Sequence, residues 1–103
     1  MEVQFPLEEL AAFCKRWEIV RLELFGSALR DDFTEKSDLD LLVTFREGQA
    51  PDLFAFSRLK TEIEKLLGRS VDVMTRKAIE KSRNPIRKEE ILRSAKVIYD
   101  EAA

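Results

Sequence analysis

Apolar and polar residues alternate along this chain with a period that changes from segment to segment. In residues 7–17, apolar side chains recur every three or four positions, which predicts a helix with one apolar face. Residues 20–25 alternate strictly, with Arg21 and Glu23 opposite the aliphatic positions, which predicts a strand. The chain therefore begins with a helix followed by a strand.

The same two periods continue through the rest of the chain. Asp52 precedes a long segment of helical period that ends at Gly68, so the two residues are expected as its N-cap and its C-terminal glycine. The buried side of this helix is expected to contain Leu53, Phe56, Leu59, Ile63, Leu66 and Leu67. We also expect strands at residues 38–45 and 70–75, short helices at residues 28–30 and 78–82, and a last helix at residues 86–100.

The predicted order α-β-α-β-α-β-α-α indicates an α+β fold with α/β-like character. We expect a small mixed sheet of three or slightly more strands, with helices packed mainly on one face. A length of 103 residues fits one domain that spans residues 1–103.

The composition excludes several classes of function. The chain has no histidine, which excludes histidine-based metal sites and Ser-His-Asp catalysis within it. Its single cysteine, Cys14, lies on the apolar face of the first helix, so we expect inert packing and a reducing compartment. The 18 Lys and Arg residues are balanced by 20 Asp and Glu residues, so no direct nucleic-acid partner is required. We expect no signal peptide and no membrane partner, which favours a cytoplasmic protein.

Carboxylates carry the chemistry that the sequence predicts. Side chains two positions apart on a strand share a face, so Asp38 and Asp40 point together, away from the aliphatic side of their strand. Asp72 lies between two valines on the next predicted strand and joins them if the two strands are neighbours. Neighbouring carboxylates repel unless a cation lies between them, and oxygen ligands favour Mg²⁺, with Mn²⁺ as an alternative.

Three such carboxylates match the requirement of two-metal nucleotidyl transfer. One ion would activate the attacking hydroxyl and the other would neutralise the triphosphate and the leaving pyrophosphate. In that arrangement Asp72 is the best candidate to face the nucleophile and act as the base.

A phosphate site is predicted directly after the first strand. Gly26 lets the backbone approach phosphate oxygens, and a helix that starts here would present free N–H donors. Ser27 adds a hydroxyl donor, and Arg30, one turn later, can reach the same triphosphate.

These residues resemble a known signature. The pattern Leu-Phe-Gly-Ser at residues 24–27, ten further residues, and Asp-Leu-Asp at residues 38–40 resembles the DNA polymerase β-like nucleotidyltransferase superfamily. Residues 25–43, with Val-Asp-Val at residues 71–73 as the third acidic position, look like its minimal nucleotidyltransferase members. Those members are the antitoxins of two-gene pairs whose partner toxin is a HEPN-domain ribonuclease. The resemblance covers essentially the whole chain.

The resemblance implies a specific activity. It implies a polymerase β-like fold and a protein adenylyltransferase that moves AMP from ATP to a tyrosine of the partner toxin and so neutralises it. We expect two Mg²⁺ ions and a hetero-oligomer with the toxin; the oligomeric state of the chain alone stays open, with a homodimer as one alternative. The implied site comprises Gly26, Ser27 and Arg30 for the nucleotide and Asp38, Asp40 and Asp72 for metal and catalysis.

Other readings remain open at this stage. The chain could neutralise its toxin by binding alone, with a nucleotide pocket that is not catalytic. A third reading is an enzyme that modifies RNA ends or a small molecule. Arg30 could be an ordinary surface charge, and Glu89, Glu90 and the basic residues between 76 and 88 are expected on solvated surfaces.

Overall fold

The fold is a four-stranded sheet between two unequal pairs of helices. The computed structural model describes residues 5–26, 38–81 and 83–102 of the chain. Its elements are α1 (Leu7–Arg16), β1 (Ile19–Phe25), β2 (Leu39–Phe45), α2 (Leu53–Leu67), β3 (Val71–Thr75), α3 (Arg76–Glu80), α4 (Pro85–Ser94) and β4 (Lys96–Asp100). The strand order is β3-β2-β1-β4, with β2 and β3 parallel and the other two pairs antiparallel. This is the mixed sheet predicted from the sequence.

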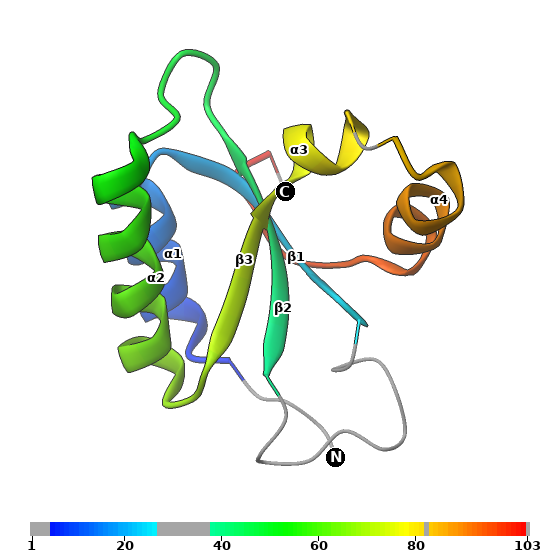
Figure 1. The fold of residues 1–103 in the computed structure, drawn as a ribbon. Helices are drawn as coiled ribbons and strands as arrows, with labels where there is room; N and C mark the ends of the chain where they lie inside the picture. Colours follow the sequence, from blue (N-terminus) through cyan, green and yellow to red (C-terminus); the bar gives the residue numbers. More distant parts are fainter. Residues whose placement is uncertain (1–4, 27–37, 82, 103) are drawn as a thin grey trace.

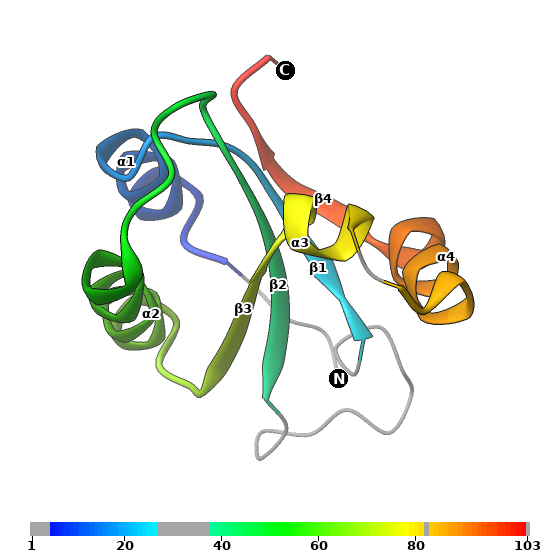
Figure 2. The same cartoon turned by 45° about the horizontal axis from the view of Figure 1, so that its top comes forward.

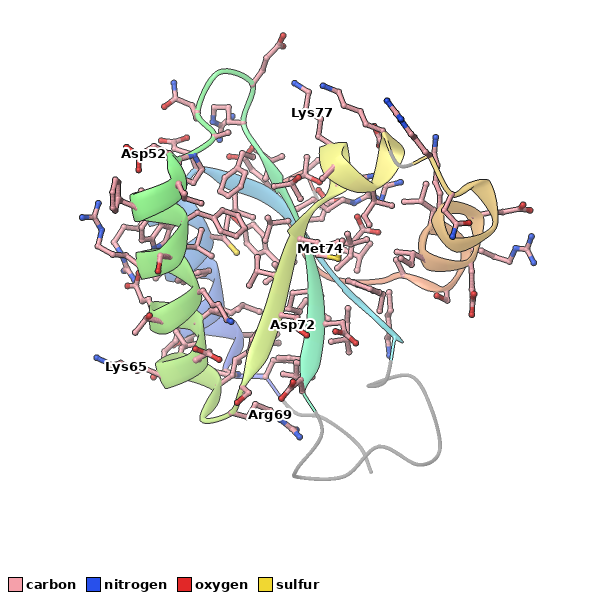
Figure 3. All side chains as sticks on the ribbon, viewed as in Figure 1. Asp52, Lys65, Arg69, Asp72, Met74 and Lys77 are labelled. Carbon is pink, nitrogen blue, oxygen red and sulfur yellow. The ribbon has the colours of Figure 1, made fainter. Side chains whose placement is uncertain are left out.

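One face of the sheet is covered by α1 and α2, which lie side by side (Figure 1). Side chains fill the layer between these helices and the strands (Figure 3). The predicted apolar side of β2 does face this layer, because Leu39, Leu41 and Val43 are buried in it. The other fully buried members of this large cluster include Leu10, Phe13, Cys14, Ile19, Leu22, Leu59, Ile63 and Val71.

The opposite face is only partly covered. There α3 and α4 lie against one region of the sheet, on the side away from α1 and α2 (Figure 2). A second, smaller cluster of buried residues fills this contact: Phe25, Leu42, Ile79 and Ile91. The helices therefore cover mainly one face, as predicted, and the other face keeps an open region.

The two ends of α2 follow from its sequence. The Asp52 carboxylate accepts a hydrogen bond of 2.8 Å from the Ala55 N–H, so Asp52 is the predicted N-cap. Gly68 adopts a left-handed conformation with φ of 69° and ends the helix. The expected buried side was wrong at one position, since Leu53 is 82% exposed. Leu53 lies in the first turn, and Phe56 is the first hydrophobic residue of α2 that packs against the core cluster.

The C-terminal segment differs from the prediction. The expected helix at residues 86–100 ends at Ser94, and residues 96–100 form β4. This strand pairs with the free edge of β1, where Arg21 is opposite Asp100 and Leu24 is opposite Lys96. The sequence Val-Ile-Tyr at residues 97–99 is β-branched and aromatic, so it suits an edge strand better than a helix.

The predicted short helix at residues 28–30 and the loop that follows it lie outside the described residues. Within the described ranges, none of the helices combines the length and the apolar character needed to cross a bilayer.

Candidate active site

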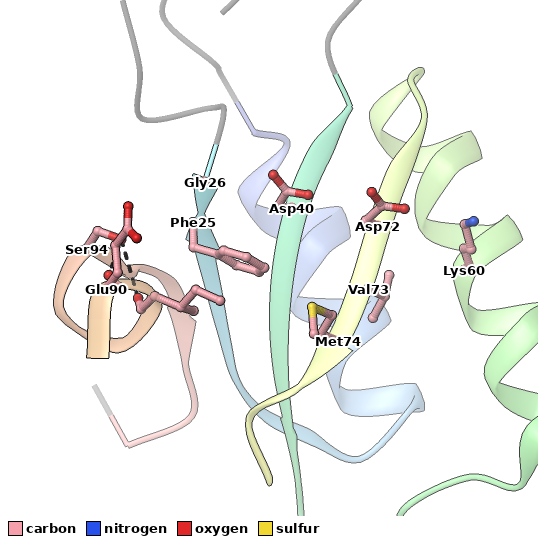
Figure 4. A pocket seen from close by; sticks show the side chains of 10 residues that line it. Phe25, Gly26, Asp40, Lys60, Asp72, Val73, Met74, Glu90 and Ser94 are labelled. Atoms are coloured by element: carbon pink, nitrogen blue, oxygen red, sulfur yellow. Dashed lines mark hydrogen bonds between the residues drawn. The ribbon is translucent and has the colours of Figure 1, made fainter. Parts of the chain in front are cut away.

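Asp40 and Asp72 lie side by side on adjacent strands. They are direct register partners in the parallel pairing of β2 with β3. Their neighbours Leu39 and Val71 point into the opposite, closed layer, so both carboxylates belong to the partly covered face. Figure 4 shows the two side chains next to each other above their strands. The predicted meeting of acids from the second and third strands is therefore present for this pair.

Gly26 lies against the Asp40 carboxylate from the end of β1, the strand on the other side of β2 from β3. It directly follows β1, whose last residue, Phe25, is paired with Asp40. Gly26 has φ of 70°, a conformation that other residues adopt only at a cost. A Cβ atom at this position would collide with the Asp40 carboxylate. Glycine is thus required both by the backbone turn and by the close approach to the acid.

A cavity of about 430 Å³ opens over these residues. This volume lies within the range of about 300–1,000 Å³ that is typical of small-molecule sites. Its lining residues are Phe25, Gly26, Asp40, Lys60, Asp72, Val73, Met74, Glu90, Ile91 and Ser94. The cavity runs across the strands, from α4 on one side to α2 on the other (Figure 4). It therefore joins an apolar floor to a row of charged side chains.

The donor set of the cavity suits a hard divalent cation. Asp40 and Asp72 offer carboxylate oxygens from neighbouring strands, and such ligands favour Mg²⁺ over softer metals. Two like charges this close are stabilised when a cation lies between them. Within residues 5–26, 38–81 and 83–102, however, no three His, Cys, Asp or Glu side chains already form a metal-binding group. The pair fits the ion, and a third ligand has to approach it.

The remaining predicted site residues lie farther from the pair or outside the described residues. Asp38 is exposed, immediately before β2, and does not line the cavity. It precedes Asp40 by two positions, the spacing that places side chains on one face where the strand continues. Ser27 and Arg30 lie outside the described residues, so their predicted phosphate contacts stay predictions.

Several cavity residues were not predicted. Lys60 belongs to α2, and Glu90 and Ser94 belong to α4. Glu90 was expected only as a solvated residue, yet it and Ser94 are four positions apart and share one side of their helix. The Ser94 hydroxyl donates a hydrogen bond of 2.9 Å to the Glu90 carbonyl. The position of α4 depends on tertiary packing, which no local sequence pattern reveals.

An ion pair with a buried carboxylate lies on the same face of the sheet, beyond the cavity. Glu23 of β1 is only 4% exposed, and Arg76 Nη1 at the start of α3 donates a hydrogen bond of 2.6 Å to its Oε1. Arg76 also donates to Glu80, one turn later in α3. The pair fixes α3 on β1, two residues before Phe25. Nothing in the local pattern distinguished Glu23 from the exposed polar positions of a half-buried strand.

Comparison with known proteins extends this geometry. The nucleotidyltransferase domain family matches residues 7–98 of the chain. A provisionally named protein adenylyltransferase of Methanocaldococcus jannaschii is 42% identical over 77 residues, which are 75% of this chain and 76% of that protein. A protein adenylyltransferase of Thermococcus cleftensis is 35% identical over 65 residues, 63% of this chain and 64% of the relative.

Solved structures agree with these relatives. A provisionally named minimal nucleotidyltransferase has a TM-score of 0.64 at 39% identity and covers 86% of this chain and 85% of that one. A toxin–antitoxin complex with AMP-PNP has a TM-score of 0.68 at 15% identity, over 93% of this chain and 74% of the other. At that identity the likeness bears on the fold alone. Sequence, fold and cavity therefore agree that the chain belongs to the nucleotidyltransferase domain family, as its glycine-serine and paired-aspartate pattern predicts.

Proposed function

We propose that this chain is a Mg²⁺-dependent protein adenylyltransferase that acts as the antitoxin of a HEPN ribonuclease toxin. It transfers AMP from ATP to a tyrosine of that partner and so neutralises it. Gly26, Ser27 and Arg30 hold the triphosphate. Asp38, Asp40 and Asp72 hold two metal ions, for which Mn²⁺ is an acceptable substitute.

The observation that carries the proposal is the register of β2 and β3. It pairs Asp40 with Asp72 directly, and it does so beside a glycine whose missing side chain leaves room for the Asp40 carboxylate. Paired acids can hold the metal ions of phosphoryl chemistry, and a glycine turn beside them lets the backbone approach a phosphate. A cavity that only bound an apolar ligand would gain nothing from this repulsive pair.

The chain's own residues have distinct tasks in this reaction. Bound metal ions supply charge neutralisation at the triphosphate when they are present. The acceptor hydroxyl oxygen forms a bond to the α-phosphorus, and the bond from that phosphorus to the bridging oxygen of the β-phosphate breaks. The Asp72 carboxylate accepts the hydroxyl proton, and pyrophosphate leaves on the side of Gly26. Phe25, Met74 and Ile91 exclude water from the floor of the cavity.

The relatives support the identity of the partner. Several are named as protein adenylyltransferases, and fold neighbours come from solved toxin–antitoxin complexes. We therefore expect a hetero-oligomer of this chain with its toxin in the cytoplasm. The chain by itself is expected to form a homodimer or to remain a single copy.

Mass spectrometry tests the proposal. The purified chain is incubated with ATP, Mg²⁺ and the small helical protein encoded by the neighbouring gene. The partner should gain one or more AMP units on a tyrosine, and omission of the metal should prevent the gain. If no nucleotide is transferred to any partner, the adenylyltransferase proposal is wrong.

A second candidate function is neutralisation by binding alone. The partly covered face of the sheet and the charged surface of α3 favour it, since both could contact another protein. The Asp38→Asn, Asp40→Asn double variant separates the two candidates in a toxicity assay. Full protection by this variant supports binding alone, and loss of protection supports catalysis.

A further inference from the structure

The two ends of the cavity differ in chemistry: one has a glycine turn and the other a lysine ammonium group. Gly26 lies at the β1 side, next to α4. Lys60 lies at the other side, beyond β3 and on α2 (Figure 4). Asp40 and Asp72 stand between them. Gly26 and Asp72 are about two strand spacings apart, roughly 10 Å.

In-line displacement assigns a role to each end. In nucleotidyl transfer the attacking and leaving oxygens lie on opposite sides of the reacting phosphorus. If the leaving pyrophosphate rests at Gly26, as the proposed function has it, the attacking oxygen comes from the side of β3. That side is the edge of the sheet, since β3 is the last strand in the order β3-β2-β1-β4. At the cavity, α4 lies on the opposite, β1 side (Figure 4), so a large acceptor can approach from this edge without passing α4.

Lys60 is suited to meet an acceptor at this edge. It is the one basic side chain among the described residues that line the cavity, which also contains three carboxylates. It is exposed, and among residues 5–26, 38–81 and 83–102 it forms no ion pair. Lysine ammonium groups are compact point charges on flexible stems, so this one can reach over the edge strand.

We propose that Lys60 binds the acceptor hydroxyl at the β3 edge and offsets the negative charge that develops on its oxygen during transfer. This inference rests on the proposed function and deepens it. The acceptor is a phenolic or alcoholic hydroxyl of a partner protein. Its oxygen lies between the Lys60 ammonium group and Asp72, while the nucleotide occupies the side of Gly26.

Two methionine substitutions on one helix test the charge. Lys60→Met removes the ammonium group at the cavity. Lys65→Met removes a similar exposed group that points away from the site (Figure 3). We expect Lys60→Met to lower the rate of AMP transfer about tenfold, the size of one charge-assisted contact. Its dissociation constant for Mg²⁺ with AMP-PNP should stay within about twofold of the wild-type value, and Lys65→Met should change neither quantity.

The same measurements include the results that would overturn the inference. A tenfold loss of AMP-PNP affinity in Lys60→Met would place the ammonium group on the phosphate side. A wild-type rate of transfer in Lys60→Met would also overturn it. If the wild-type chain neither binds AMP-PNP nor transfers AMP, the proposed function fails, and a cross-linking experiment decides the position of the acceptor independently.

Cross-linking uses introduced thiols, which can be labelled selectively because the chain's single cysteine is buried and therefore slow to react. Lys60→Cys and Lys65→Cys each introduce one accessible thiol, to which a benzophenone maleimide is attached. Irradiation with the partner protein should join position 60, and not position 65, to the partner segment that carries the acceptor hydroxyl. Equal cross-links from both positions, another partner segment, or no adduct from position 60 would each overturn the inference.

Discussion

The two faces of the sheet are built for different purposes. The face under α1 and α2 is closed by a large cluster of buried aliphatic and aromatic side chains. The face under α3 and α4 has a small cluster at one region and a cavity with charged residues beside it. The same strands serve both faces, because alternate residues point in opposite directions. Stability is thus concentrated on one face, which leaves the other free to hold repulsive carboxylates.

The largest expected effect is the loss of AMP transfer when the acids of the open face are replaced and the closed face is left unchanged. Asp40→Asn and Asp72→Asn should each lower AMP transfer by at least about a hundredfold, because the proposed metal site loses a charged ligand. Glu47→Gln, an exposed loop carboxylate, is the matched control and should transfer normally. Rates are measured under single-turnover conditions, and thermal melting checks the fold. A melting temperature that falls sharply in the aspartate variants would mean that these acids stabilise the fold.

The next effect compares the same substitution on the two faces. Ile63→Ala creates a cavity in the closed layer and should cost about 2–5 kcal/mol of unfolding free energy. Ile91→Ala lies in the small cluster, which can relax toward the open cavity, and should cost about 1–3 kcal/mol. Denaturant unfolding measures both. Equal losses would contradict the proposed division between the faces.

A smaller effect is expected from the Glu23–Arg76 ion pair on the partly covered face. Arg76→Met leaves the buried Glu23 carboxylate without its 2.6 Å partner and should cost about 1–3 kcal/mol, since Arg76 is itself partly exposed. Adding Glu23→Gln should recover part of the loss, because no buried charge then remains. Arg93→Met removes an exposed pair with Glu89 on α4 and should change stability by less than about 1 kcal/mol.

The smallest effect concerns Cys14 in the closed layer. Burial raises the pKa of its thiol from 9.0 to about 12, so the group stays protonated and unreactive at neutral pH. A maleimide should label it only after unfolding. The unfolded chain ionises this thiol at a lower pH than the folded one, so the stability contribution is complete below about pH 9 and is lost as pH rises toward 12. Unfolding at pH 7.5 and 10.5, with Cys14→Ala as the control, measures this loss.

Much of the fold follows from local sequence patterns, and so do the directions in which the acids of the site point. Period-two alternation located β1, β2 and β3, and the cap at Asp52 and the glycine at 68 defined α2. The facing directions of Asp40 and Asp72 also follow from alternation. That these strands are parallel neighbours in direct register is a tertiary fact, and the prediction of a shared site depended on it.

The missed features share one physical cause. No glycine or proline separates α4 from β4, so residues 86–100 read as one helix, whereas the free edge of β1 selects a strand. Glu23 reads as a solvated position and is buried because α3 packs over it. Lys60 and Glu90 gain a role only from the cavity that the assembled elements form. In each case tertiary contacts decide the outcome.

The direct pairing of Asp40 with Asp72 restricts the length of the connection between β2 and β3. The two acids are separated by the β2–α2 loop, a whole helix and the three-residue turn Gly68–Ser70. Shifting β3 by one residue would turn Asp72 into the aliphatic layer and place Val71 or Val73 opposite Asp40. Insertions are therefore tolerable in the exposed loop before α2, whereas the turn after α2 must keep its number of residues. Homologues and designed variants that keep the acids should keep that turn's length even where their loops differ.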